Sequence, residues 1–151
     1  MSPRFHTAFT LAASVAVVAA VAWGFILAGS PATRRLERFD VQRLRDLKTI
    51  AREIQSTVED PAAANPKDKG SLKAPLPKTL EEAAKSARGE KINLRDPETG
   101  ESYGYTVKND STYELCATFA RSRDEDAGVF WNHPAGPHCF TINVLDPPPY
   151  W

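Results

Sequence analysis

Two cysteines carry the most specific chemistry in the chain. Cys116 and Cys139 are its only cysteines, and each lies at a polar position in a stretch where apolar and polar residues alternate. If these stretches are neighbouring strands of one sheet, both thiols lie on its polar face and can form a disulfide. The bond would close a loop of about 24 residues and stabilise the fold by roughly 3 kcal/mol. It would also place the domain in an oxidising compartment.

The same cysteines, together with His133 and His138, offer two thiols and two imidazoles, which is the donor set of many zinc sites. The spacing argues against such a site, because His138 is adjacent to Cys139 and points the other way along a strand. The chain also has no Cys-x-x-Cys pair, and a disulfide would use both thiols. We therefore expect no zinc site.

Three consecutive carboxylates, Asp124, Glu125 and Asp126, are the weak candidates for a calcium site. Calcium prefers several carboxylate oxygens, but adjacent acidic residues in a polar loop are usually solvated. The alternating acidic positions of an EF-hand loop are absent. We predict no metal ion and no cofactor.

No pattern of residues marks an active site. The sequence lacks a Gly-x-Ser-x-Gly elbow, a phosphate-binding Gly-rich loop and a His-Glu-x-x-His helix, and nothing pairs its carboxylates for acid–base catalysis. Lys plus Arg and Asp plus Glu are equal at 19 each, which leaves no electrostatic footprint for nucleic acid. The sequence predicts a protein that is not an enzyme and does not bind nucleic acid.

An apolar segment near the N-terminus has the length of a membrane span. After a short tail at residues 1–7, residues 8–29 are apolar or small throughout, and as a helix they would be about 33 Å long. A cleaved signal peptide is the alternative, because Arg4 precedes the segment and Ala28-Gly29-Ser30 offers small residues for cleavage. The segment exceeds the roughly 7–15 apolar residues of a signal peptide. We therefore predict a retained transmembrane helix in the lipid bilayer.

Small residues recur every four positions along this span, notably Ala12, Ala16, Ala20 and Gly24. Such a face lets a second helix approach closely, which would suit a homo-oligomer or a membrane-protein partner. The span is rich in alanine, so the same spacing also arises by chance. The sequence leaves both interpretations open.

Residues 30–151 predict one soluble α+β domain that begins with a long amphipathic helix over residues 30–60. Ser30-Pro31 is a helix start, and Asp60-Pro61 should end the helix. Apolar residues recur at three- and four-residue steps, while Arg, Asp and Glu take the other face. The stripe consists of Val41, Leu44, Leu47, Ala51, Ile54 and Val58, with Leu36 and Phe39 before it.

The rest of this domain supplies a partner for the helix. Residues 61–77 are rich in Pro, Ala and Lys and predict a loop, and Thr79 with Glu82 forms a capping box for a short helix over residues 79–86. Residues 103–145 predict a small antiparallel sheet of about three to four strands, because apolar alternation recurs there between turn residues. One face of that sheet is apolar and can cover the amphipathic helix.

Two segments carry a family resemblance: Leu76-Pro77-Lys78-Thr79-Leu80-Glu81-Glu82 and Asp96-Pro97-Glu98-Thr99-Gly100-Glu101-Ser102-Tyr103-Gly104-Tyr105. Together with the two N-terminal helices, they resemble the pseudopilins and type IV pilin-like proteins, in which a similar Asp-Pro-led turn enters the sheet of the head. The resemblance implies a pilin-like head domain. It does not extend to the prepilin start, because Ala8-Phe9-Thr10-Leu11-Ala12-Ala13 lacks the Gly and Glu that serve cleavage and filament assembly.

Two signals for the side of the membrane disagree. The positive-inside rule places cations in the cytoplasm, and six follow the span closely: Arg34, Arg35, Arg38, Arg43, Arg45 and Lys48. The disulfide-compatible cysteines indicate export, and we give them more weight. We predict a single-pass protein of the bacterial cytoplasmic membrane with its C-terminal domain on the periplasmic side.

These features predict a non-catalytic, membrane-anchored envelope protein whose pilin-like head is an interaction or assembly subunit. The alternative is a membrane-anchored sensor whose head binds a ligand or a metal ion.

Overall fold

The computed structural model describes residues 3–28, 31–58, 72–87, 92–124 and 129–148. The chain divides into two compact units, Met1–Leu36 and Glu37–Trp151. Within these ranges, three helices precede three strands along the sequence. The expected loop at residues 61–77 and the expected helix end at Asp60-Pro61 lie largely outside the described residues.

The first helix, α1, runs from Pro3 to Ala28. Among its described side chains the large apolar ones are exposed: Phe9, Leu11, Val18 and Phe25, for example, are 68–70% exposed. Among the described residues it provides the one segment that is long and apolar enough to cross a membrane. A helix that is apolar all round needs an apolar surrounding.

The second helix, α2, spans Pro31–Val58 and begins at the proline that the sequence marks as a first helical residue. Its buried apolar residues form one stripe: Leu44, Leu47, Ile50, Ala51, Ile54 and Val58. This stripe differs from the predicted one, because Ile50 lies in the core and Val41 is 53% exposed. Val41 is six residues from Leu47, which places it about 120° away around the helix.

The prediction that acidic and basic residues of α2 face solvent is wrong for four of them. Asp40, Arg43, Asp46 and Glu53 are all buried. Their positions fall in step with the core stripe, and their charges are therefore directed toward the rest of the domain. The amphipathic pattern distinguishes apolar from polar residues, but the domain buries both kinds.

A short helix, α3, covers Leu80–Ser86 and confirms the predicted start. The Thr79 hydroxyl accepts a hydrogen bond from the Glu82 amide at 3.2 Å, as a capping residue does. The return bond of a capping box is shifted by one residue, because the Glu82 carboxylate accepts from the Lys78 amide at 2.7 Å.

The sheet is antiparallel, with β1 (Gly104–Val107), β2 (Thr112–Phe119) and β3 (Gly136–Asn143) in that order. The sequence alternation of the third strand indicates a start at Cys139, but the strand begins earlier, because Gly136 to His138 pair with Phe119 to Ala117. The predicted α+β class and small antiparallel sheet are confirmed.

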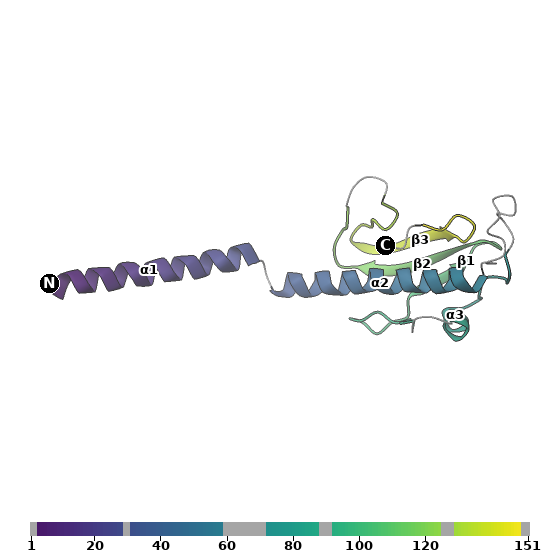
Figure 1. Cartoon of the computed structure of the whole chain (residues 1–151), viewed down its shortest axis with the longest axis horizontal. Coiled ribbons are helices and arrows are strands. Elements are labelled where there is room, and N and C mark those ends of the chain that lie inside the picture. Colours follow the sequence, from purple (N-terminus) through teal and green to yellow (C-terminus); the bar gives the residue numbers. More distant parts are fainter. Residues whose placement is uncertain (1–2, 29–30, 59–71, 88–91, 125–128, 149–151) are drawn as a thin grey trace. The chain divides into compact units, whose positions relative to one another are not determined.

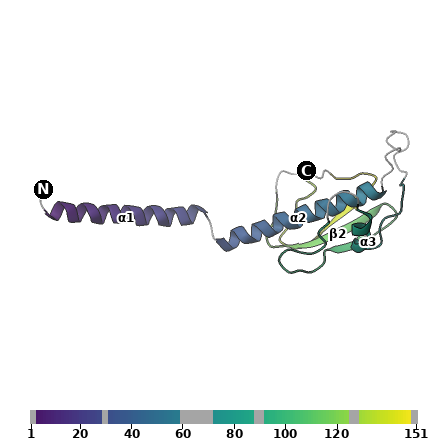
Figure 2. The ribbon, with the colours of Figure 1, turned by 60° about the horizontal axis from the view of Figure 1, so that its bottom comes forward.

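The sheet and α2 lie along each other and enclose the hydrophobic core (Figures 1 and 2). Side chains of the central and third strands alternate as predicted, with Tyr113, Leu115, Phe140 and Ile142 buried. Trp131, from the segment between β2 and β3, is 1% exposed and belongs to the same core. One apolar face of the sheet is thereby used to bury one stripe of the helix.

Candidate functional site

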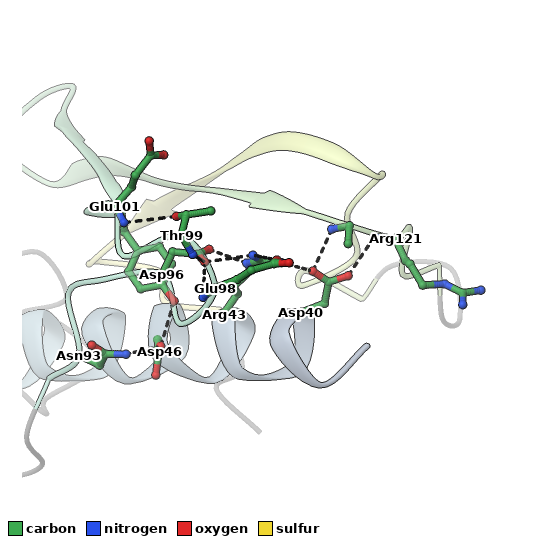
Figure 3. A network of polar contacts seen from close by, with 11 residues as sticks. Asp40, Arg43, Asp46, Asn93, Asp96, Glu98, Thr99, Glu101 and Arg121 are labelled. Atoms are coloured by element: carbon green, nitrogen blue, oxygen red, sulfur yellow. Dashed lines mark hydrogen bonds and ion pairs between the residues drawn. The ribbon is translucent and has the colours of Figure 1, made fainter. Parts of the chain in front are cut away.

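A buried arginine at the centre of a carboxylate network is the most distinctive polar feature of the domain. Arg43 of α2 is 3% exposed, and its guanidinium donates from Nε and Nη2 to the two oxygens of Asp96. It also donates from Nη1 to Asp40 at 2.8 Å and from Nη2 to Glu98 at 2.6 Å. Figure 3 shows these carboxylates converging on the arginine from the helix and from the turn before the sheet. The forked geometry is the one in which arginine binds carboxylates most strongly.

Asp96 organises the turn that leads into the sheet. Its Oδ1 accepts hydrogen bonds from the amides of Glu98 at 2.8 Å and Thr99 at 3.0 Å, and Gly100 completes the turn at φ +74°. Burial alone would raise the pKa of Asp96, but the bonds from Arg43 and from these two amides outweigh burial and lower the pKa to about 2. Asp96 is therefore a carboxylate throughout the neutral range.

Asp40 connects the start of the buried part of α2 to the end of β2. Its two oxygens accept from the backbone amides of Ala120 and Arg121, both at 2.9 Å. These amides lie just beyond the last residue of the strand, where sheet pairing no longer provides acceptors. The carboxylate thus ends the strand and also binds Arg43.

A third buried carboxylate, Asp46, lies three residues after Arg43 on α2. The same oxygen, Oδ2, accepts from the Tyr103 hydroxyl at 2.9 Å and from the Asn93 side-chain amide at 2.8 Å. Burial raises the pKa of Asp46, with these two hydrogen bonds opposing it. Burial, and then the bond to Asp46, raise the pKa of Tyr103.

All three nitrogens of the Arg43 guanidinium donate hydrogen bonds within this network. Its hydrogen bonds to Asp96, Glu98 and Asp40 raise its pKa above the already high ordinary value, although burial opposes them. The arrangement therefore holds α2, the turn at residues 96–100 and the end of β2 together. The network fixes the position of the turn relative to α2, although Arg43 and Asp96 are 53 residues apart in the sequence.

Sequence reasoning missed this network because it assigned Arg43 and Asp46 to the solvent face. A signal was nevertheless present: Asp40, Arg43 and Asp46 recur at three-residue steps on the side of the helix that carries Leu47. The Asp-Pro turn was recognised, but its partner on the helix was not.

The predicted disulfide between Cys116 and Cys139 is confirmed. The two residues are directly opposite each other in the β2–β3 register, on the face of the sheet away from the core. Gly104 is opposite Cys116 on the other side, in β1. A Cβ atom at Gly104 would lie 2.9 Å from the Cys116 Cβ, so glycine at this position gives Cys116 the space that it needs.

The structure does not bring the zinc candidates together. Both cysteine sulfurs are bonded to each other, and the His133 ring is stacked on Phe119 with centroids 3.6 Å apart. The His138 ring packs edge-on against Phe140. The three-residue group of donor atoms found among the described residues, Glu114 with the two cysteines, contains the disulfide itself.

Two further sets of predicted residues are placed in part. Asp124 is described, whereas Glu125 and Asp126, the other weak calcium candidates, lie outside the described residues. The small residues Ala12, Ala16, Ala20 and Gly24 are all exposed along α1.

Hollows flank the network and the disulfide. The hollow beside Arg43, of 520 Å³, extends past Asp96, Glu98 and Glu101 to Cys116 and Thr118. Its walls include the carboxylates of the turn and the outer side of the disulfide-bonded strand.

No family model, no curated protein and no solved structure matches the chain.

Proposed function

We propose that this chain is a non-catalytic, single-pass membrane protein of the bacterial envelope. Its α+β head would lie on the periplasmic side of the cytoplasmic membrane and act as an interaction or assembly subunit. The observation that carries the proposal is an uncovered apolar helix of membrane-spanning length in the same chain as a disulfide-bonded domain.

The exposed surface of α1 supports the anchor. Large side chains such as Val18 and Trp23 are more than 60% exposed, and α1 contains no acidic residue. At about 25 cal/mol per Å² of apolar surface, leaving such a helix in water is strongly unfavourable. A bilayer removes that cost without a protein partner.

The disulfide supports the periplasmic side. Disulfides persist in oxidising compartments and are rare in the cytosol, and both cysteine sulfurs of this chain are used in one bridge. The cations after the span oppose this orientation under the positive-inside rule. One of them, Arg43, is buried among carboxylates, although the others remain.

The order of elements supports a pilin-like head. A long helix packs along an antiparallel sheet, and the turn from Asp96 to Gly100 leads into that sheet, as the resemblance implies. The Tyr105 hydroxyl donates to the Pro77 carbonyl at 2.7 Å. This bond joins the two segments that carry the resemblance.

The small-residue face of α1 is the surface that we assign to a partner in the membrane. Ala16, Ala20 and Gly24 would allow another helix, from a second copy or from a different membrane protein, to approach closely. Replacing Ala20 and Gly24 with leucine should abolish cross-linked oligomers in detergent, whereas leucine at Val18 and Val21 should leave them. Purification of the unaltered chain as a monomer without any partner would contradict the assembly role.

Thiol labelling of cells tests the side of the membrane. With the head in the periplasm, a membrane-impermeant maleimide should label the chain in spheroplasts only after treatment with an impermeant reductant, because Cys116 and Cys139 are bonded. With the head in the cytoplasm, both thiols would be free and would react only after permeabilisation. A Cys116→Ala/Cys139→Ala variant is the control for labelling of other proteins, and the second pattern would overturn the proposal.

A further inference from the structure

The exposed side of α2 carries a continuous row of cations. Arg38, Arg45 and Arg52 are exposed on the side of the helix opposite Leu47, and the half-buried Lys48 lies at the edge of this side, about 100° from Leu47. Their spacing of seven, three and four residues keeps them within about 80° around the helix axis. We call these four residues, with Val41, the basic face.

Acidic residues do not neutralise this face from within the helix. In the stretch from Arg38 to Arg52, the acidic residues are Asp40 and Asp46, and both are buried toward the sheet. Asp40 is bound by Arg43 and by two backbone amides. The helix therefore directs its carboxylates inward and its cations outward, although the whole chain has no net charge.

The surface at the basic face is concave. A hollow of 370 Å³ lies over it, with Val41 and Leu44 as apolar lining and Arg45, Lys48, Arg52 and Arg123 around them. The Lys48 ammonium lies 5.5 Å from the centroid of the buried Trp131 ring. This combination of several cations around a small apolar area suits a ligand with phosphate groups and adjacent apolar atoms.

We propose that the basic face binds the headgroups of anionic phospholipids. This inference rests on the proposed membrane anchorage. Only two residues separate Ala28 from Pro31, so a membrane-spanning α1 would start α2 within about 10 Å of the bilayer. The row from Arg38 to Arg52 extends about 21 Å, which covers several headgroups. A helix face that combines cations with apolar residues is attracted to the anionic lipids of the leaflet that it faces.

The test uses the full chain with a nitroxide label at Val41→Cys, in the centre of the basic face. Both native cysteines are bonded to each other, so the label reacts at one position. The chain is placed in nanodiscs of phosphatidylcholine alone or mixed with phosphatidylglycerol. The accessibility of the label to oxygen relative to a water-soluble nickel chelate reports its contact with lipid.

We expect this ratio to rise when phosphatidylglycerol is present and to fall back in high salt. The rise should be lost in Arg45→Gln/Arg52→Gln and retained in Lys78→Gln/Lys85→Gln, which removes two exposed cations elsewhere. A label at Thr106→Cys, an exposed residue of β1, should not respond to lipid composition. Thermal unfolding of each variant checks that the fold is retained.

Three results would overturn the inference. A label at Val41→Cys that ignores lipid composition would show that the basic face serves another partner, such as an acidic protein. An equal response to inorganic phosphate in phosphatidylcholine discs would identify a site for free phosphate. Failure of the full chain to enter either disc would overturn the membrane anchorage and the lipid contact with it. If the chain enters the discs and the accessibility ratio does not change with lipid composition, only the lipid contact is overturned.

Discussion

At the scale of single residues, the head depends on a few buried charges whose partners come from distant parts of the chain. Arg43 binds both oxygens of Asp96, and Asp40 joins the arginine to the end of β2. A buried ion pair adds little compared with an apolar pair of the same volume, but removing one partner leaves an uncompensated charge. The network is therefore better understood as a determinant of geometry than as a source of stability.

Replacement of this arginine should be among the most damaging single changes in the head. Arg43→Met leaves Asp40 and Asp96 buried without their cation, and we expect a loss of about 3–5 kcal/mol in the free energy of unfolding. Arg45→Met, at an exposed position of the same helix, should change it by no more than about 0.5 kcal/mol. Urea unfolding of both variants measures the difference, and equal stabilities would contradict the structural role of Arg43.

A buried histidine predicts how the stability of the head depends on pH. His133 is 5% exposed and stacked on Phe119, and burial lowers its pKa below the ordinary 6.5. In the unfolded chain the imidazole binds a proton as the pH falls through about 6.5, whereas the folded head resists protonation. Stability should be full above this pH and should decrease from there down to the lower folded pKa.

Unfolding measured between pH 7.5 and 5 checks this expectation. A His133→Gln variant should have a flatter profile than the unaltered chain, even if its stability at pH 7.5 is lower. His138→Gln is the matched control, because it changes the other histidine of the head and keeps His133. An unchanged slope in His133→Gln would show that other groups cause the acid sensitivity.

At the scale of elements, α2 is the component on which the domain is assembled. One side supplies the core stripe and the buried network, and the opposite side supplies the basic face. The sheet covers the first side with Tyr113, Leu115, Phe140 and Ile142. A helix of this kind obtains most of its stability from packing of the buried side.

The corrected position of the stripe leads to a direct test. Leu47 is 0% exposed and Val41 is 53% exposed, although the sequence pattern placed both in one stripe. Leu47→Ala should lower the free energy of unfolding by about 2–5 kcal/mol. Val41→Ala should change it by no more than about 0.5 kcal/mol. Similar losses in thermal or urea unfolding would restore the predicted stripe and contradict the observed packing.

At the scale of the whole molecule, the chain combines an uncovered apolar helix with a head that has its own core. The head buries most of its large apolar residues in its own core, whereas the described side chains of α1, residues 6–26, are exposed. The two units therefore differ in their surfaces, and the length and apolar surface of α1 are those of a helix that could cross a membrane. This contrast is the physical basis for treating the chain as a membrane-anchored domain.

Charges placed in the middle of α1 should release the chain from the membrane. Val17 and Val21 are 62% and 53% exposed, and an arginine at each would cost about 2.5–3.5 kcal/mol in the bilayer centre. Val17→Arg/Val21→Arg should move the chain into the soluble fraction after alkaline extraction of membranes. Val17→Leu/Val21→Leu should remain in the pellet, and extraction of the unaltered chain would contradict the anchor.

Features that depend only on neighbouring residues could be predicted from the sequence alone. The apolar run of α1, the proline start of α2, the Thr79 cap and the alternation of β2 and β3 all follow from local spacing. The pairing of Cys116 with Cys139 followed from that alternation, because side chains on a strand have a fixed two-residue period.

Only the tertiary structure decided which polar residues enter the interior. Asp96 lies 53 residues from Arg43, and no local sequence pattern determines the position along α2 at which the turn at residues 96–100 packs. The register of the sheet along α2 turns Val41 outward and brings Asp40, Arg43 and Asp46 inward. Burial of these charges is possible because each finds a partner there, and the partners come together only when the chain is folded.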